Sequence, residues 1–128
     1  MKEGLRMNKR EMIRLRIEQA VGIANTDPEG QKLARKLANG KLLVKVGEEL
    51  RIPIKIENGT LTIVDDPSHP RAICAFSDAE AAWALLTNSI SPYAATVHRQ
   101  LDQMGLSTMN ETFEKIWLLA HERLDAKN

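Results

Sequence analysis

Few side chains in this chain of 128 residues could do acid–base, nucleophilic or metal chemistry. The three histidines, His69, His98 and His121, do not share the short spacing of a zinc-binding pair. Asp65 and Asp66 supply only half of a cation site, because no further carboxylates follow at alternating positions, and turn formation explains them better. We therefore predict no metal, no cofactor and no catalytic residue.

The single cysteine, Cys74, lies between Ile73 and Ala75 in a short apolar segment. A nucleophilic thiol is usually exposed and close to a positive charge, so this one is predicted to be buried and unreactive. One cysteine also excludes an intrachain disulfide, which suits a reducing compartment. No segment has the apolar length of a membrane span or the core of a signal peptide, and we expect a cytoplasmic protein.

The charge of the chain is nearly balanced, with a formal net charge of +1. Aromatic residues do not alternate with basic ones on the predicted strands, so nucleic acid is not an expected partner. The segment Met1–Arg16 is nevertheless rich in basic residues. Either it is the solvated start of a helix, or Arg10, Arg14 and Arg16 face an anionic membrane surface or another phosphate-bearing ligand. The charge pattern favours the solvated helix and leaves the second interpretation open.

Apolar surface, rather than reactive groups, is what the chain offers. Between Ala81 and Val97 no residue is charged, although charged residues make up 27% of the chain. Thr87, Asn88 and Ser91-Pro92 interrupt this segment, which predicts two short helices rather than a membrane span. Short helices of this kind either fill the core or leave an apolar cavity above a sheet, in which a lipid or cofactor would fit.

The sheet that must support these helices is marked by Arg51–Val64, RIPIKIENGTLTIV. Asn58-Gly59 is typical of a type I′ turn, because both central residues tolerate a positive φ. This turn sets a register in which Ile54 pairs with Ile63. One face of the hairpin is then aliphatic and the other polar, which predicts an antiparallel sheet with helices on one face only.

The remaining elements follow from hydrophobic periodicity and capping residues. The segment 99–105 is a short edge strand or the tail of the preceding helix, and the alternation of Leu101 with polar neighbours favours the strand. In chain order we also expect helices at 8–24 and from Asp27-Pro28 to Asn39-Gly40, strands at 41–46, 51–57, 60–64 and 71–76, a helix capped by Ser77 and ending near Thr87, a short helix starting at Ser91-Pro92, and a final helix capped by Asn110.

This order of elements and three local sequences resemble the sterol carrier protein 2 type lipid-transfer domain. The resemblance runs from about Gln31 to Leu124. It rests on the turn IENGTLTIVDD, the strand-to-helix segment PRAICAFSDAEAAWALL and the segment SISPYAATVHRQLDQMGLSTMNETFEKIWLLAH. It implies a single domain over residues 1–128, in which residues 1–26 form a basic amphipathic helix and residues 27–128 form the core that is similar to the family.

The resemblance also implies an α+β fold, with a five-stranded, mainly antiparallel sheet, helices on one face and an apolar tunnel between the sheet and the carboxy-terminal helices. The implied function is non-catalytic binding of a lipid-like ligand, such as a fatty acid, acyl-CoA, sterol or isoprenoid, and transfer of that ligand is left open. The implied tunnel residues are Trp83, Leu86, Tyr93, Val97, Leu101, Met104, Phe113, Ile116 and Trp117.

A different function remains compatible with the same apolar residues. The chain would then be a small protein-interaction or regulatory subunit whose apolar face is buried in an oligomer or against a partner. The sequence leaves a homo-oligomer open under either interpretation.

Overall fold

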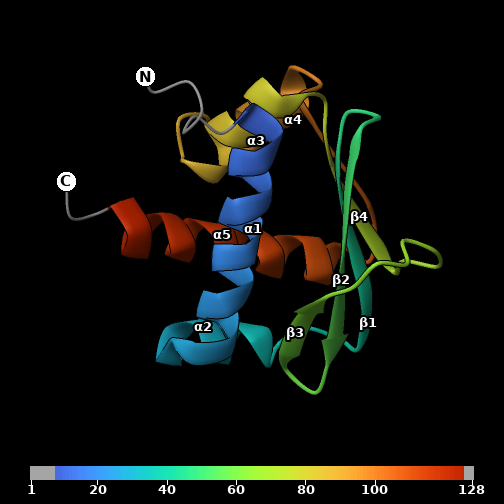
Figure 1. Cartoon of the computed structure of the whole chain (residues 1–128), viewed down its shortest axis with the longest axis vertical. Helices are drawn as coiled ribbons and strands as arrows, with labels where there is room; N and C mark the ends of the chain where they lie inside the picture. The colour runs from blue at the N-terminus through green and yellow to red at the C-terminus, as the bar shows by residue number, and fades with distance from the viewer. Residues whose placement is uncertain (1–7, 126–128) are drawn as a thin grey trace.

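The computed structural model describes residues 8–125, so the basic residues Lys2 and Arg6 of the amino-terminal segment lie outside the described range. A layer of helices covers one face of a sheet (Figure 1). In chain order the elements are helices α1 (Lys9–Thr26) and α2 (Pro28–Ala34), strands β1 (Gly40–Val46), β2 (Leu50–Glu57), β3 (Thr60–Ile63) and β4 (Ala72–Phe76), helices α3 (Ala79–Leu86) and α4 (Pro92–Val97), strand β5 (Leu101–Gly105) and helix α5 (Ser107–Asp125).

The sheet has five strands in the order β3-β2-β1-β4-β5. The β2–β3 hairpin extends the sheet on one side of β1. The chain then crosses to the other side of β1, where β4 pairs with it in parallel. The other three neighbouring pairs are antiparallel. The predicted α+β class and five-stranded, mainly antiparallel sheet are confirmed, and so is the predicted strand at 99–105, which forms as β5.

The hairpin turn has the predicted conformation and register. Asn58 and Gly59 have φ values of 51° and 79°, as a type I′ turn requires. Ile54 pairs with Ile63, and the pairing continues to Glu57 and Thr60 next to the turn. The turn residues therefore place every Leu and Ile side chain of β2 and β3 on the same side of the sheet.

The inner face of the sheet is aliphatic and forms the floor of the core. α1 covers it with Ile13, Ile17 and Ala20, and α5 covers it with Phe113 and Trp117, each at most 1% exposed. Burying one large aliphatic side chain contributes about 1.5–3 kcal/mol, which makes this face the main source of stability. Its residues, each at most 3% exposed, are Leu42, Val44, Val46, Ile52, Ile54, Ile56, Leu61, Ala72, Cys74, Phe76 and Leu101.

The outer face of the sheet carries one apolar row among its polar side chains. Leu43 pairs with Pro53 of β2 and with Ile73 of β4, and Ile73 pairs with Met104 of β5. Leu43 is only 6% exposed, whereas Met104 at the edge of the sheet is 41% exposed. The row matters for the site described below, because it places Met104 on the face away from the helices.

Helix starts agree with the sequence at α2 and differ at α3. The Asp27 carboxylate accepts hydrogen bonds from the backbone N–H of Glu29 and Gly30 at 2.9 and 3.2 Å, which confirms the predicted cap of α2. The predicted Ser77 cap of α3 is wrong. The backbone N–H of Ser77 still donates to Gln100, so the cap moves to Asp78, whose side chain accepts from Ala81 at 2.8 Å.

The predicted Asn110 cap of the last helix is also wrong, because α5 begins three residues earlier at Ser107. The backbone N–H of Asn110 already donates to Leu106 at 3.3 Å, as in a continuing helix. Its side-chain amide donates to the Met104 carbonyl at 3.0 Å. Asn110 is 3% exposed, so it joins the first turn of α5 to the end of β5 instead of capping the helix.

An ion pair joins the junction of α1 and α2 to the end of α5. Arg123 Nε lies 2.7 Å from Asp27 Oδ2, and the same guanidinium contacts Glu29. The hydrogen bond from Arg123 is the main reason that the pKa of Asp27 is lower than its ordinary value of 3.8. The end of α5 is therefore connected through one carboxylate to the junction of α1 and α2, which is distant from it in sequence.

Two glycines, one in a crowded position and one in open space, provide a test of the fold. Gly105 has a φ of 83°, and an added Cβ would lie within 2.9 Å of the Ala72 Cα. Gly22, inside α1, would place its Cβ in open space. We predict that Gly105→Ala destabilises the protein by about 2 kcal/mol or more, whereas Gly22→Ala stabilises it by about 0.5–1 kcal/mol. Urea unfolding measures both, and equal effects of the two changes would contradict the placement of β5 against β4.

The Asp27–Arg123 pair predicts a pH dependence of stability. A carboxyl group with a lowered pKa in the folded state adds stability above its unfolded pKa and loses it as the pH falls through the folded pKa. Asn also caps helices well, so Asp27→Asn should keep the cap and remove only this dependence. Urea unfolding between pH 7 and pH 3 should show a smaller acid loss of stability for Asp27→Asn than for the wild type. When Arg123→Met is added to both proteins, their profiles of stability against pH should become similar. If Asp27→Asn lost as much stability in acid as the wild type does, the ion pair would be contradicted.

Candidate functional site

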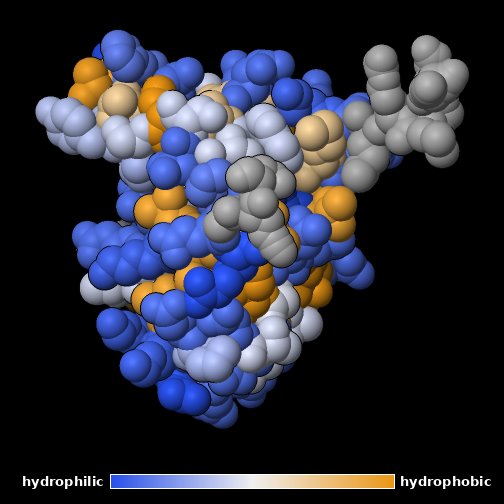
Figure 2. All heavy atoms as spheres, turned by 90° about the vertical axis from the view of Figure 1, so that its left-hand side faces the viewer, coloured by the Kyte–Doolittle hydropathy of each residue, from blue (hydrophilic) through white to orange (hydrophobic). Residues whose placement is uncertain are grey.

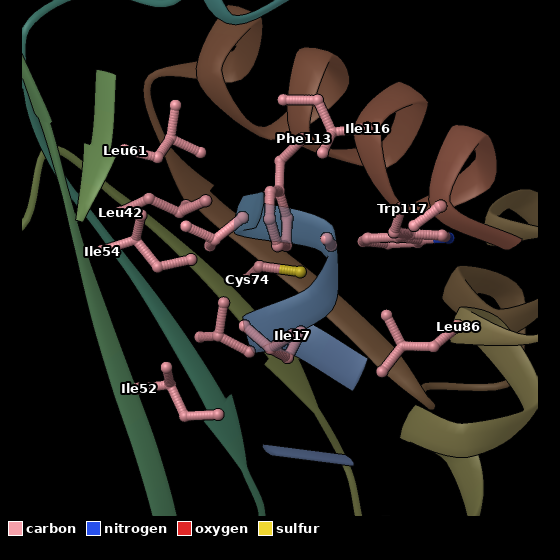
Figure 3. Close-up of a cluster of buried hydrophobic side chains, with 14 of the residues drawn as sticks. Ile17, Leu42, Ile52, Ile54, Leu61, Cys74, Leu86, Phe113, Ile116 and Trp117 are labelled. Carbon is pink, nitrogen blue, oxygen red and sulfur yellow. The ribbon is translucent and has the colours of Figure 1, made fainter. Parts of the chain in front are cut away.

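One apolar cluster fills the space between the sheet and the helices (Figure 3). We call it the interlayer cluster. It joins α1, four strands, α3 and α5, and its members are at most 2% exposed. They are Ile17, Leu42, Ile54, Cys74, Phe76, Leu86, Leu101, Phe113, Ile116 and Trp117.

Trp117 is the aromatic centre of this cluster. Its ring centroid lies 5.7 Å from Phe113 with an interplanar angle of 84°, and 5.7 Å from Phe76 with an angle of 55°. Such edge-to-face and tilted pairs add about 0.5–1.5 kcal/mol beyond the area they bury. The indole thus links α5 to β4 across the whole layer.

Five of the nine predicted tunnel residues are brought together here: Leu86, Leu101, Phe113, Ile116 and Trp117. Trp83 of α3 is half-buried beside them. Its ring lies under two cations from α1, with Lys9 Nζ at 5.9 Å and Arg16 Cζ at 5.4 Å from the ring centroid. Trp83 therefore contacts the polar edge of the site, where α1 and α3 meet.

Three predicted tunnel residues lie elsewhere. Tyr93 and Val97 are 81% and 59% exposed, because the buried residue of the six-residue helix α4 is Ala95 and these two share a different side. Met104 lies three positions after Leu101 on β5. Side chains alternate along a strand, so an odd separation places Met104 on the outer face while Leu101 faces the helices. In the structure none of these three residues contributes to the interlayer cluster.

Arg16 does not lie on a basic surface, where the membrane-facing interpretation of the sequence placed it. It is only 8% exposed, and its Nη2 donates to both carboxylate oxygens of Asp125 at 3.1 and 3.2 Å. Arg10 and Arg14 stay on the surface. Their guanidinium groups lie 3.2 Å from Glu49 and 3.5 Å from Glu18. Arg16 is therefore not available for a contact with an anionic surface. It points inward because it lies on the same side of α1 as the buried residues Ile13 and Ile17.

Several half-buried polar groups around the cluster were missed by the sequence interpretation. Gln103 of β5 donates to Glu114 of α5 at 2.6 Å. Its inward direction could have been found from the same alternation that separates Leu101 from Met104. His121 Nδ1 lies 2.7 Å from Asp125 Oδ2, four residues further along α5. The interlayer cluster is therefore apolar at its centre, and polar side chains of β5 and α5 lie around it.

Cys74 lies inside the cluster, as predicted, and is 1% exposed. Burial, together with the nearby charge of Glu114, raises the pKa of its thiol far above the ordinary value. Residues 8–125 contain no group of three His, Cys, Asp or Glu side chains that could hold a metal ion. Within the same residues no helix has the length and apolar character to cross a membrane.

The position of the predicted tunnel is occupied by the cluster side chains in the described part of the chain. A hollow of about 450 Å³ opens instead where β1 begins and β2 ends, beside the loop at 66–69. It is lined by residues such as Lys41, Ile56 and His69 and by none of the nine predicted tunnel residues. A ligand between the sheet and the helices would have to displace side chains of α3, α4 or α5.

Comparison with known proteins finds similarity at the level of structure. No protein-family model and no curated protein matches the sequence. UbiJ-SCP2, a ubiquinone synthesis protein, superimposes with a TM-score of 0.65 at 13% identity, over 88% of this chain and 94% of the other. Sterol carrier protein domain 2 of Helicoverpa armigera gives a TM-score of 0.63 at 14% identity, over 88% and 89% of the two chains. The chain has the sterol carrier protein 2 fold.

This fold is also that of sterol carrier protein 2 from Aedes aegypti, solved in complex with the fatty acid palmitate. That structure matches with a TM-score of 0.60 at 13% identity, over 88% of this chain and 96% of the other. Identities this low show the fold alone. The resemblance inferred from the turn, the strand-to-helix segment and the last helix is thus confirmed for the sterol carrier protein 2 fold.

The burial of Cys74 can be tested directly. We predict that the folded protein does not react with a disulfide reagent such as DTNB at pH 8, because the thiol is inaccessible and its thiolate is disfavoured. Reaction should become complete in unfolding concentrations of urea. A matched variant with the cysteine moved to the exposed residue Thr60 (Cys74→Ala with Thr60→Cys) should react at once. Equal rates for the two folded proteins would contradict the interlayer position of Cys74.

Proposed function

We propose that the protein binds a lipid-like apolar molecule between the sheet and helices α3, α4 and α5, without catalysing a reaction on it. The observation that carries this proposal is the sterol carrier protein 2 fold, combined with an interlayer cluster built almost wholly from aliphatic and aromatic side chains. A largely apolar lining with a few polar groups at its boundary suits such a ligand.

The names of the structural neighbours support the class of ligand. The Aedes aegypti protein is described in complex with a C16 fatty acid, and UbiJ-SCP2 is described as a ubiquinone synthesis protein. Both molecules named there have long apolar portions. For this chain we propose the shared chemistry, a long apolar chain or ring system, and no single compound.

The energetics of such binding are favourable without any reactive group. Burying about ten methylenes at about 0.8 kcal/mol each yields about 8 kcal/mol before the costs of ordering and association. Displacing packed side chains adds a further cost, so the opening should involve the least extensive elements. α3 and α4 have eight and six residues and are joined by the polar segment 87–91, whereas α1 and α5 are long. We propose that α3 and α4 move to admit the ligand.

Native mass spectrometry of the freshly purified protein, together with titration of a fluorescent fatty acid, tests the proposal. We expect a co-purified small molecule or a saturable 1:1 titration. Absence of both would contradict lipid binding. If light scattering then showed an oligomer that is stable on dilution, the interaction-subunit interpretation would be supported instead.

A pair of substitutions at Leu86 tests where the ligand lies. Leu86→Trp adds a large ring between α3 and α5, where the ligand would have to enter, and should weaken fatty-acid binding at least about tenfold, equivalent to about 1.4 kcal/mol. Leu86→Ala creates space and should retain binding, although it destabilises the fold by about 2–5 kcal/mol. The control Leu15→Trp adds the same ring at a 40% exposed position of α1. Equal affinities of Leu86→Trp and Leu15→Trp, with circular dichroism showing both folded, would exclude the interlayer site.

A further inference from the structure

Two hydrogen-bond donors are buried without a partner among the described residues. They are Nη1 of Arg16 on α1 and Nε1 of Trp117 on α5. The Arg16 side chain is 9% exposed and Trp117 is 1% exposed. A buried donor without an acceptor costs about 1–3 kcal/mol, and native proteins rarely keep one without a reason. Two of them around one cluster point to an acceptor that another molecule supplies.

The Arg16 donor lies where α1 approaches both α3 and α5. Nη2 of Arg16 is held by Asp125 of α5, and the guanidinium lies 5.4 Å from the ring centroid of Trp83 on α3. Trp117, His121 and Asp125 follow each other at intervals of four residues, so they lie along one side of α5. Figure 3 shows the indole nitrogen at the end of the Trp117 ring that is farther from the strands, on the side of Leu86 of α3.

The charges around these donors restrict the acceptor. Asp125 already neutralises Arg16, and His121 shares the same carboxylate. Lys9, which also lies near the Trp83 ring, is 4.0 Å from Glu80. A ligand carboxylate beside Arg16 would add a second negative charge next to Asp125 in a largely apolar environment, which is costly. An uncharged oxygen acceptor accepts both hydrogen bonds without that cost.

We propose that Arg16 Nη1 and Trp117 Nε1 bind an uncharged carbonyl group, as in a ketone, ester or quinone, at the polar end of the ligand. The inference rests on the proposed function and adds the chemistry of the head group to it. The apolar remainder of the ligand then lies along Leu86, Phe113 and Ile116. Arg16 and Trp117 select the ligand by its head group, while the interlayer cluster binds the chain with little selectivity.

Nuclear magnetic resonance of the indole groups tests this assignment without changing the site. The chain has two tryptophans, so a ¹⁵N-labelled sample has two indole N–H signals, and Trp83→Phe assigns the signal of Trp117. Titration with 2-undecanone and, separately, with undecane compares two ligands of equal chain length. We expect a downfield shift of the Trp117 indole proton with the ketone only, because only the ketone can accept its hydrogen bond.

Substitutions provide the second measurement. Trp117→Phe and Arg16→Met each remove one donor, and each should reduce the preference for the ketone over the alkane by about tenfold. Arg14→Met, at a half-buried position on the same helix, should leave the preference unchanged. Circular dichroism and methyl spectra establish that each variant is folded.

The possible results separate this inference from the proposed function. If methyl signals of the interlayer cluster show that both ligands bind but the Trp117 indole responds equally to them, the head-group assignment is wrong and lipid binding stands. If undecanoate binds more tightly than 2-undecanone and shifts the same indole, the acceptor is a carboxylate and the uncharged-head proposal is wrong. If neither ligand binds, the proposed function fails, and the assignment fails with it.

Discussion

The aliphatic inner face of the sheet is the constraint on which the rest of the structure depends. Its eleven buried side chains from five strands cannot remain in water, so α1 and α5 must cross over them. The turn at Asn58-Gly59 determines which side of β2 and β3 is aliphatic, and the strand pairing carries that choice to β1, β4 and β5. The interlayer cluster is the result, and it is the only place where a long apolar molecule could meet residues from both layers of the described chain.

The same cluster explains why ligand binding would involve motion. Trp117 packs against Phe113 and Phe76, and no space is left at the centre of the described layer. The boundary is different in character, because the Arg16–Asp125 ion pair and the hydrogen bond from Gln103 to Glu114 bring charged and polar groups to the edges of α1, α5 and β5. An apolar centre with polar groups at its boundary favours a molecule with one polar end. In our proposal, the short helices α3 and α4 are the part of the cover that moves.

Much of the fold could be predicted from the sequence, because local signals were strong. Asn58-Gly59, Asp27-Pro28 and the Ile alternation of β2 each specify a local geometry that packing only reinforces. The site was less predictable. Met104 was expected beside Leu101 from the family resemblance, but the two residues are three positions apart on β5 and lie on opposite faces of the sheet. Tyr93 and Val97 are exposed, because α4 is too short for its buried side to be predicted from periodicity. Arg16 and Asn110 were predicted with other roles, as a surface cation and a helix cap, because their partners, Asp125 and the Met104 carbonyl, depend on how α5 packs.

Intermolecular nuclear Overhauser effects between methyl-labelled protein and an unlabelled long-chain lipid test the central claim most directly. Our account predicts effects from the lipid methylenes to the methyl groups of Ile17, Leu86 and Ile116, which come from three different helices of the interlayer cluster. Effects confined to surface methyl groups such as those of Val97, or to the outer-face residue Leu43, would contradict it.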